Sequence, residues 1–205
     1  KFKLKNKIKK INKYLNFTIK NNYLNNENFN SSLNICIEIL KKLKISKRII
    51  EKGLSHFKSL PHRQQIVRKI KNIQFVNDSK ATNAHAATTS LGAFESVVWI
   101  AGGLAKGQSF DALIERVATR LRGVVLMGTD REVIRRSLEL HAPLVPIMEV
   151  ASRDPDAMTE VVRLAHRLAQ PADTVLLAPA CASWDMFANY GDRGDRFTRA
   201  VRELV

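Results

Sequence analysis

A carboxylate, two hydroxyls and an ammonium group lie within the five residues from Asp78 to Thr82. The apolar run Ile73–Val76 before them predicts a short buried strand, and the alanine-rich stretch from Ala84 predicts a helix after them. A strand-to-helix turn is where an open α/β sheet usually binds its ligand, and the N–H groups at a helix start favour an anion. The turn is therefore a candidate anion site, although a polar loop that only caps backbone groups has the same composition.

A second cation, Lys106, lies in the glycine-rich turn after the apolar run Val97–Ala101. We expect this ammonium at the carboxyl edge of the sheet, where ligands bind. A solvated surface lysine is the default interpretation of any single Lys, but Lys106 is the only lysine after Lys80. Ser183 follows the predicted strand Thr174–Leu177 and is expected at the same edge, where it could also serve as a helix N-cap.

Short strands and helices alternate from residue 66 onward and must position these side chains. The predicted strands are Ile66–Ile70, Ile73–Val76, Val97–Ala101, Val124–Met127, Val145–Glu149 and Thr174–Leu177, and the predicted helices start at Ala84 or span Phe110–Leu121, Asp130–Leu140, Pro155–Ala169 and Asp192–Leu204. This alternation predicts an α/β fold, a Rossmann-like and mostly parallel sheet with helices on both faces. The first two strands predict one antiparallel edge.

The first 57 residues predict a separate and incomplete α/β segment. Ser31 and Ser32 are expected to cap a helix from Leu33 to Leu43, and Ser46 a second helix that ends by Gly53. Apolar patches within residues 14–19 could be strands. A linker leading to Pro61 follows, so we predict domains at 1–57 and 58–205.

The positive charge of the chain is confined to its first part. Residues 1–83 hold 17 Lys and 3 Arg against 4 acidic residues, whereas residues 84–205 hold 1 Lys and 13 Arg against 15. A basic segment can bind nucleic acid, but these lysines are scattered among Asn and Ile without aromatic interleaving or a zinc pattern. We expect no nucleic-acid partner and attribute the charge to a codon bias that favours Lys, Asn and Ile.

Other sequence features indicate a cytoplasmic protein. No apolar run approaches the roughly 20 residues of a membrane span, and the N-terminus lacks the apolar core of a signal peptide. Cys36 and Cys181 match no metal-ligand spacing, and both are expected to be reduced and buried. No phosphate-binding motif of the form G-x-x-x-x-G-K-[ST] occurs.

Four stretches in a fixed order resemble the motifs of the Mur ligase family. They are Leu60-Pro61-His62-Arg63, Asp78-Ser79-Lys80-Ala81-Thr82-Asn83, Ala101-Gly102-Gly103-Leu104-Ala105-Lys106-Gly107 and Pro179-Ala180-Cys181-Ala182-Ser183-Trp184-Asp185-Met186-Phe187. The second of them is similar to the form found in the members that add D-glutamate. The resemblance covers the chain from about Leu54 to Val205.

The resemblance implies an ATP-dependent amide-bond-forming ligase of peptidoglycan precursor synthesis. Such an enzyme activates the carboxylate of UDP-N-acetylmuramoyl-L-alanine as an acyl phosphate, which the amine of D-glutamate then attacks. Residues 58–205 would be the C-terminal domain and residues 1–57 the tail of the central ATPase domain. The N-terminal and central domains, which carry the P-loop and the Mg²⁺ ligands, would be needed for activity, so we expect this chain to be inactive alone.

The resemblance also assigns roles to individual residues. Lys80 would be a catalytic cation, D-glutamate would be bound by Thr82, Lys106, Ser183 and Tyr190, and ATP would be contacted by Arg63, Asp78 and Asn30. The sequence departs from the family at Ala105, where Asp is common, and around Asn30, where Gly-x-His-Asn is usual. Structural alternatives are an ion pair between Arg63 and Asp78, ordinary packing for Tyr190 and helix capping by Asn30.

Three further hypotheses remain open. The chain could be a nucleotide-binding Rossmann module without ligase activity, as the missing P-loop suggests, or a basic nucleic-acid-binding protein. It could also belong to another Mur ligase, although those usually carry an Asp-Tyr-Ala-His-like motif. The composition changes near Asn83, so we also hypothesise that two related ligase sequences of different genomic composition are joined there.

Overall fold

The chain forms two compact units, Lys1–Lys58 and Ser59–Val205. A computed structural model describes residues 27–56 and 60–204. Within this part, no helix is long and apolar enough to cross a membrane. The proposed strands at residues 14–19 lie outside the described residues.

The described part of the first unit is a helix pair, α2 (Glu27–Lys42) and α3 (Lys47–Ser55). The helices share a small core of Ile37 and Ile50, against which other apolar side chains pack. Ser31 and Ser32 are not caps, because α2 begins earlier, at Glu27. Serine is only weakly unfavourable inside a helix, so its preference for a cap is easily overridden.

The cap and the end of α3, and the exposure of Cys36 in α2, also differ from the expectation. Ser46 does precede α3 as its N-cap, but its side chain makes no capping hydrogen bond, and α3 continues past Gly53 to Ser55. Cys36 is exposed rather than buried, whereas Cys181 is buried as expected.

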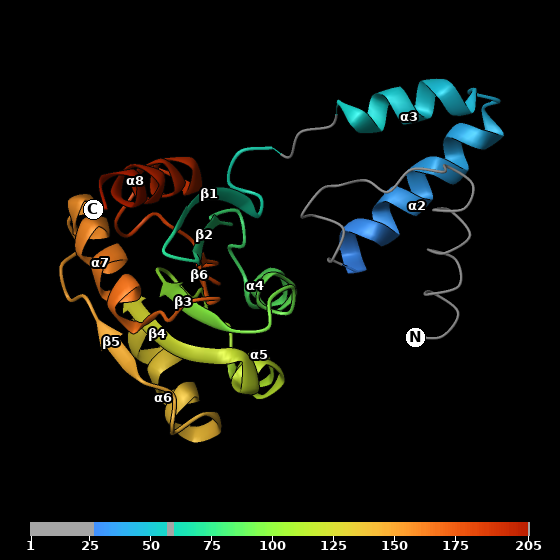
Figure 1. Cartoon of the computed structure of the whole chain (residues 1–205). Helices are drawn as coiled ribbons and strands as arrows, with labels where there is room; N and C mark the ends of the chain where they lie inside the picture. Colours follow the sequence, from blue (N-terminus) through green and yellow to red (C-terminus); the bar gives the residue numbers. More distant parts are fainter. Residues whose placement is uncertain (1–26, 57–59, 205) are drawn as a thin grey trace. The chain divides into compact units, whose positions relative to one another are not determined.

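The second unit contains a six-stranded sheet in the order β1-β2-β6-β3-β4-β5 (Figure 1). The strands are β1 (Gln65–Ile70), β2 (Ile73–Asn77), β3 (Val97–Gly102), β4 (Leu121–Met127), β5 (Ile147–Glu149) and β6 (Thr174–Leu177). β1 pairs antiparallel with β2, and all other pairings are parallel. The predicted mostly parallel sheet with one antiparallel edge is confirmed.

Helices cover both faces of this sheet (Figure 1). One face packs against α4 (Ala84–Leu91), α5 (Asp111–Val117) and α6 (Arg131–His141), and the other against α7 (Met158–Leu168) and α8 (Tyr190–Glu203). The bounds differ from the predicted ones mainly at two places. The helix predicted to Leu121 ends in the 3-10 turn Ala118–Arg120, because Leu121 already pairs with Val97 in the sheet, and the first turn of the helix predicted from Pro155 is 3-10.

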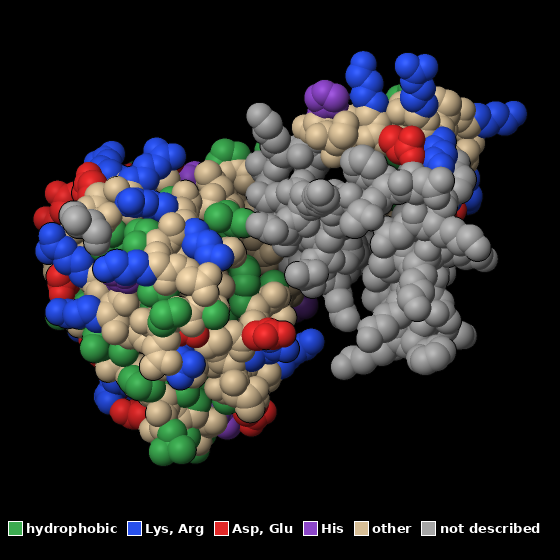
Figure 2. Space-filling model, in the orientation of Figure 1, with side chains coloured by type: hydrophobic (Ala, Val, Ile, Leu, Met, Phe, Trp, Pro, Cys, Tyr) green, Lys and Arg blue, Asp and Glu red, His purple; other side chains and the backbone are tan. Residues whose placement is uncertain are grey.

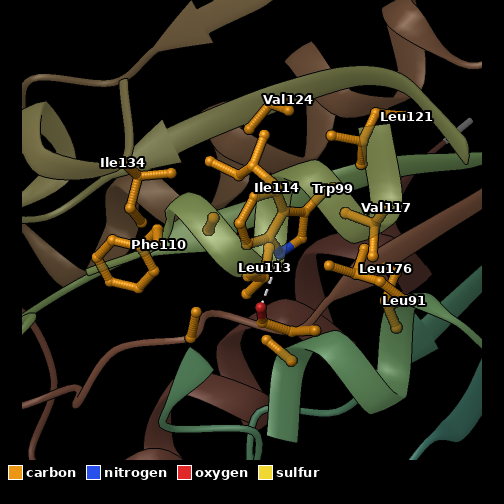
Figure 3. Close-up of a cluster of buried hydrophobic side chains, with 14 of the residues drawn as sticks. Leu91, Trp99, Phe110, Leu113, Ile114, Val117, Leu121, Val124, Ile134 and Leu176 are labelled. Carbon is orange, nitrogen blue, oxygen red and sulfur yellow. Dashed lines mark hydrogen bonds between the residues drawn. The ribbon is translucent and has the colours of Figure 1, made fainter. Parts of the chain in front are cut away.

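Trp99 lies at the centre of the core on the α4–α6 face (Figure 3). Its side chain is fully buried and surrounded by aliphatic side chains from β4, β6, α4 and α5. Its indole N–H donates to the carbonyl of Ala178, 2.8 Å away, just after β6. A buried Trp usually finds such a partner, and this one ties the core to the loop that carries Ser183.

Charged side chains are distributed differently over the two units (Figure 2). Lys and Arg side chains project from the described helices of the first unit. On the visible face of the second unit, basic and acidic side chains are interspersed. This distribution agrees with the near-neutral composition of residues 84–205.

Candidate functional site

Three loops that leave the carboxyl ends of β2, β6 and β3 lie side by side, because β6 is inserted between the other two strands. Main-chain hydrogen bonds join each loop to the next. Ala180 donates to Ala81 over 2.9 Å, and Gly102 donates to Pro179 over 2.9 Å. Leu104 and Ala182 exchange two hydrogen bonds of 3.0 Å each. The loops that carry the predicted site residues therefore form one connected edge.

The loop after β2 is a tight turn that leads into α4. The Asp78 N–H donates to Leu177 of β6, and the Asp78 carbonyl accepts from Ala81, each over 2.8 Å. Asn83 is the N-cap of α4, and its side chain accepts from the Ala86 N–H at 2.9 Å. The predicted strand-to-helix turn is thus present, with the cap supplied by Asn83.

The Asp78 carboxylate is almost completely buried at the base of this turn, with 9% of the residue exposed. Burial raises the pKa of the carboxyl above its ordinary value, while Ser90, the Gln64 N–H and the charge of Arg63 act against this rise. Gln64 donates to Asp78 Oδ1 over 3.2 Å. Ser90 Oγ is near the carboxylate but makes no hydrogen bond of its own in the described structure. A buried carboxylate with a perturbed pKa at a sheet edge is typical of a functional site.

Lys80 and Tyr190 form a pair across two loops. The ammonium of Lys80 lies 3.7 Å from the centre of the Tyr190 ring, within cation–π range. The Lys80 N–H donates to the carbonyl of His62 at 3.1 Å, which ties this turn to the stretch that contains Arg63. Thr82 is partly buried in the same turn. Arg63 is exposed and acts electrostatically on Asp78.

Arg193 on α8 holds two of the loops together and was not predicted from the sequence. Its side chain is fully buried. Nε donates to Ser79 Oγ at 3.0 Å, one terminal nitrogen donates to the Ser79 carbonyl at 2.9 Å, and the other donates to the Cys181 carbonyl at 3.1 Å. Burial lowers the pKa of this guanidinium to about 10. Charged side chains are almost never fully buried without partners, so the pattern of α8 gave no signal of this role.

His62 and Asn77 anchor the other side of the turn to α8. The Asn77 amide nitrogen lies 2.8 Å from the Gly194 carbonyl and 3.1 Å from both Thr198 Oγ1 and His62 Nδ1. Any Cβ at position 194 would overlap the imidazole ring of His62. Glycine at position 194 therefore allows α8 to approach the Leu-Pro-His-Arg stretch.

The loop after β3 presents Lys106. Gly103 has a φ of 129°, and a Cβ there would overlap the carbonyl oxygen of Ala182, so only glycine permits this approach of the two loops. Lys106 itself has a φ of 54° and is exposed. Its ammonium lies 4.0 Å from the centre of the Trp184 ring.

Two aspartates that were not among the predicted site residues connect the loop after β3, the end of β4 and the loop after β6. Asp130 accepts from the Ala105 N–H at 2.7 Å, and Asp185 accepts from the Thr129 N–H at 2.7 Å. These bonds connect the end of β4 to the loops after β3 and β6. Asp185 stands within the Pro179–Phe187 motif, and this was the only sequence signal for either residue.

Ser183 is buried, with 3% of the residue exposed. Its carbonyl accepts from Met186 and Phe187, whereas the N-cap of α8 is Asn189. Ser183 therefore does not cap α8; it lies at the start of the short turn at 184–186. Burial raises the pKa of the neighbouring Cys181 thiol to about 12, so this thiol is not reactive near neutral pH.

Asn30 does not belong to the unit that contains the other predicted site residues. It lies in α2, in the first unit, and its side chain is outside the described structure. In the second unit the arrangement combines the ammonium groups of Lys80 and Lys106 with the hydroxyls of Thr82 and Ser183 on connected loops. Such a set can bind a small ligand that carries more than one negative charge.

Comparison with known proteins gives a consistent result. Residues 62–181 match the model of the Mur ligase, glutamate ligase domain. The chain is 52% identical over 167 residues to a UDP-N-acetylmuramoylalanine--D-glutamate ligase of Thermobifida fusca, an alignment that covers 82% of this chain and 36% of the relative. It is 54% identical over 160 residues to the ligase of the same name in Streptomyces coelicolor, covering 78% and 34%.

A solved structure shares the fold. The UDP-N-acetylmuramate-alanine ligase MurC of Thermotoga maritima matches with a TM-score of 0.57 and 13% identity, over 83% of this chain and 36% of that one. The chain thus spans about a third of the length of the relatives that it matches.

Proposed function

The chain belongs to the Mur ligase family, and we propose that its second unit receives D-glutamate in an ATP-dependent ligase that joins this amino acid to UDP-N-acetylmuramoyl-L-alanine. The main support is that the loops after β2, β6 and β3 are hydrogen-bonded to one another and carry cations and hydroxyls. D-Glutamate has two carboxylates and so needs more than one positive or donor group at fixed places.

We assign the recognition of D-glutamate to four residues. Lys106 is the main charge partner of a carboxylate, because it is exposed and presented by a loop whose path is fixed by Gly103. Thr82 and Ser183 donate their hydroxyls from the two adjacent loops. Tyr190 contributes indirectly, since its ring holds the ammonium of Lys80.

ATP would supply the phosphoryl group that activates the carboxylate of UDP-N-acetylmuramoyl-L-alanine. Arg63 is suited to phosphate oxygens, and Asp78 can accept hydrogen bonds from ribose hydroxyls. Asn30 is a further candidate contact from the first unit. Lys80 would stabilise negative charge that develops when the amine attacks the activated carboxylate.

No Mg²⁺ ligand is assigned within the part of the chain that the structure covers. Among these residues, no group of three or more His, Cys, Asp or Glu side chains is arranged to hold a metal ion. We propose that the ion that accompanies ATP is bound by the regions of the relatives that this chain does not span. The same regions would bind the UDP sugar, and the complete reaction would take place in the cytoplasm.

A hybrid enzyme tests this proposal. Residues 60–205 are placed in the Streptomyces coelicolor ligase instead of the segment that they match, and the product is measured with D-glutamate, L-glutamate and D-alanine as acceptors. The expected result is amide formation that depends on ATP and prefers D-glutamate. A soluble, folded hybrid that forms no product, or that prefers D-alanine, would contradict the proposed substrate.

A further inference from the structure

Trp184 is an unusually exposed aromatic side chain next to a predicted substrate-binding residue. It is 66% exposed, while the other tryptophan, Trp99, is fully buried in the core. Because most of its surface is exposed, the Trp184 ring is not held by packing in the core. Its one described ring contact is with the Lys106 ammonium, 4.0 Å from the ring centre.

The backbone brings these two residues together. Leu104 and Ala182 exchange two main-chain hydrogen bonds, which fix the distance between the loops two residues before each partner. Asp130 holds Ala105, and Asp185, directly after Trp184, holds Thr129. Lys106 also has a left-handed backbone that non-glycine residues seldom adopt. The meeting of the ammonium and the ring therefore follows from a rigid framework.

An aromatic ring can orient a cation and still leave its charge free to bind an anionic ligand. The negative face of the ring attracts the ammonium without supplying a formal countercharge. Within the described residues, no carboxylate forms an ion pair with Lys106, so its charge is not already neutralised. The structure uses the same arrangement at Lys80, which lies over Tyr190.

We propose that Trp184 is a positioning residue that holds Lys106 in place for a carboxylate of the acidic amino acid. This inference rests on the proposed function. A free lysine side chain samples many rotamers and must lose that freedom when it binds a ligand. With its ammonium already on the indole ring, Lys106 loses less freedom on binding, and the affinity for D-glutamate is higher.

The experiment uses the full 205-residue chain with ¹³C-labelled lysine. The indole ring shifts the signals of the Lys106 side chain upfield, and the Lys106→Arg variant identifies these signals by their loss. D-Glutamate is then titrated into the wild type and into Trp184→Ala, Trp184→Leu and Trp184→Phe. Leu144→Ala, at a site that is 95% exposed, is the surface control.

We expect the upfield shift to be present in the wild type and in Trp184→Phe and lost in Trp184→Ala and Trp184→Leu. The dissociation constant for D-glutamate should rise about two- to fivefold in the Ala and Leu variants, as expected for an exposed cation–π contact. If the affinity for D-glutamate is retained in Trp184→Phe but not in Trp184→Leu, the ring acts through its cation–π contact and not through its apolar volume. The control should bind as the wild type does.

Three results would overturn the inference. Unchanged affinity in Trp184→Ala, with Lys106 signals that still move in the wild type, would refute the role of Trp184 and leave the proposed function standing. Tighter binding in Trp184→Ala would show that the ring competes with the ligand. No D-glutamate binding to the wild-type chain at saturating concentrations would contradict the proposed site and, with it, this inference.

Discussion

Replacing Arg193 with alanine should destabilise the second unit strongly, by about 3–5 kcal/mol. The guanidinium is fully buried and donates to Ser79 Oγ, the Ser79 carbonyl and the Cys181 carbonyl. Ser79 belongs to the loop after β2 and Cys181 to the loop after β6, so Arg193 bonds to both loops. Its loss should therefore weaken both loops together.

The expected loss of stability in Arg193→Ala follows from two opposing contributions to the free energy of unfolding. Burial lowers the pKa of Arg193 well below its ordinary value, to about 10, which corresponds to about 3 kcal/mol against the charged form. Three hydrogen bonds from a charged donor contribute roughly 1.5–3 kcal/mol each and exceed this cost. The alanine variant loses these bonds and leaves buried oxygens without donors. We therefore expect its free energy of unfolding to fall by about as much as when one partner of a buried ion pair is removed.

Urea unfolding of the full chain measures this effect through tryptophan fluorescence, since both tryptophans lie in the second unit. In thermal unfolding of the same chain, followed by the same signal, we expect the melting temperature to fall by about 10 °C or more. Arg202→Ala removes an exposed arginine of the same helix and should change stability by less than about 0.5 kcal/mol. An Arg193→Ala variant within about 1 kcal/mol of the wild type would show that the buried guanidinium does not hold the two loops.

Two further predictions concern carboxylates. Asp78→Asn should raise the melting temperature at pH 7, because burial raises the pKa of Asp78 and so penalises its charged form. This gain should shrink as the pH falls through the raised pKa of the folded protein and be absent below the ordinary value of 3.8, and a lower melting temperature at pH 7 would contradict it. Glu132→Gln should flatten the acid limb of the stability curve, because hydrogen bonds from Arg135 and Arg136 lower the pKa of Glu132 to about 2. The stabilisation by Glu132 is complete above its unfolded value of 4.5 and is lost as the pH falls towards 2; parallel acid limbs for Glu132→Gln and the wild type, recorded with Glu203→Gln as the control, would count against this.

The sheet could be predicted from the sequence because its determinants are local. The run Ile73–Val76 and the alanine-rich stretch after Asn83 have the periods of a strand and a helix, and both elements form where expected. Boundaries were less accurate where tertiary pairing decides them, as at Leu121, which joins β4 through Val97. Ser31 and Ser32 failed as caps because a residue preference of a few tenths of a kcal/mol does not fix a helix start.

The predicted site was incomplete for a different reason. Lys80, Thr82, Lys106 and Ser183 could be proposed because motifs and strand ends mark them. Arg193 lies among polar residues in the first turn of α8, and its role depends on which loops fold against α8. Asp130 and Trp184 likewise act through residues that are distant in sequence, at Ala105 and Lys106, and no local pattern encodes such contacts.

Steady-state kinetics of the hybrid ligase test whether Lys106 recognises a carboxylate of D-glutamate. Lys106→Ala is compared with the parent hybrid at varied D-glutamate and at varied ATP. Loss of one partner of a hydrogen-bonded charge pair costs a few kcal/mol, so KM for D-glutamate should rise roughly a hundredfold, while KM for ATP stays nearly constant. If both constants rise together, or if neither changes, Lys106 is not the carboxylate partner.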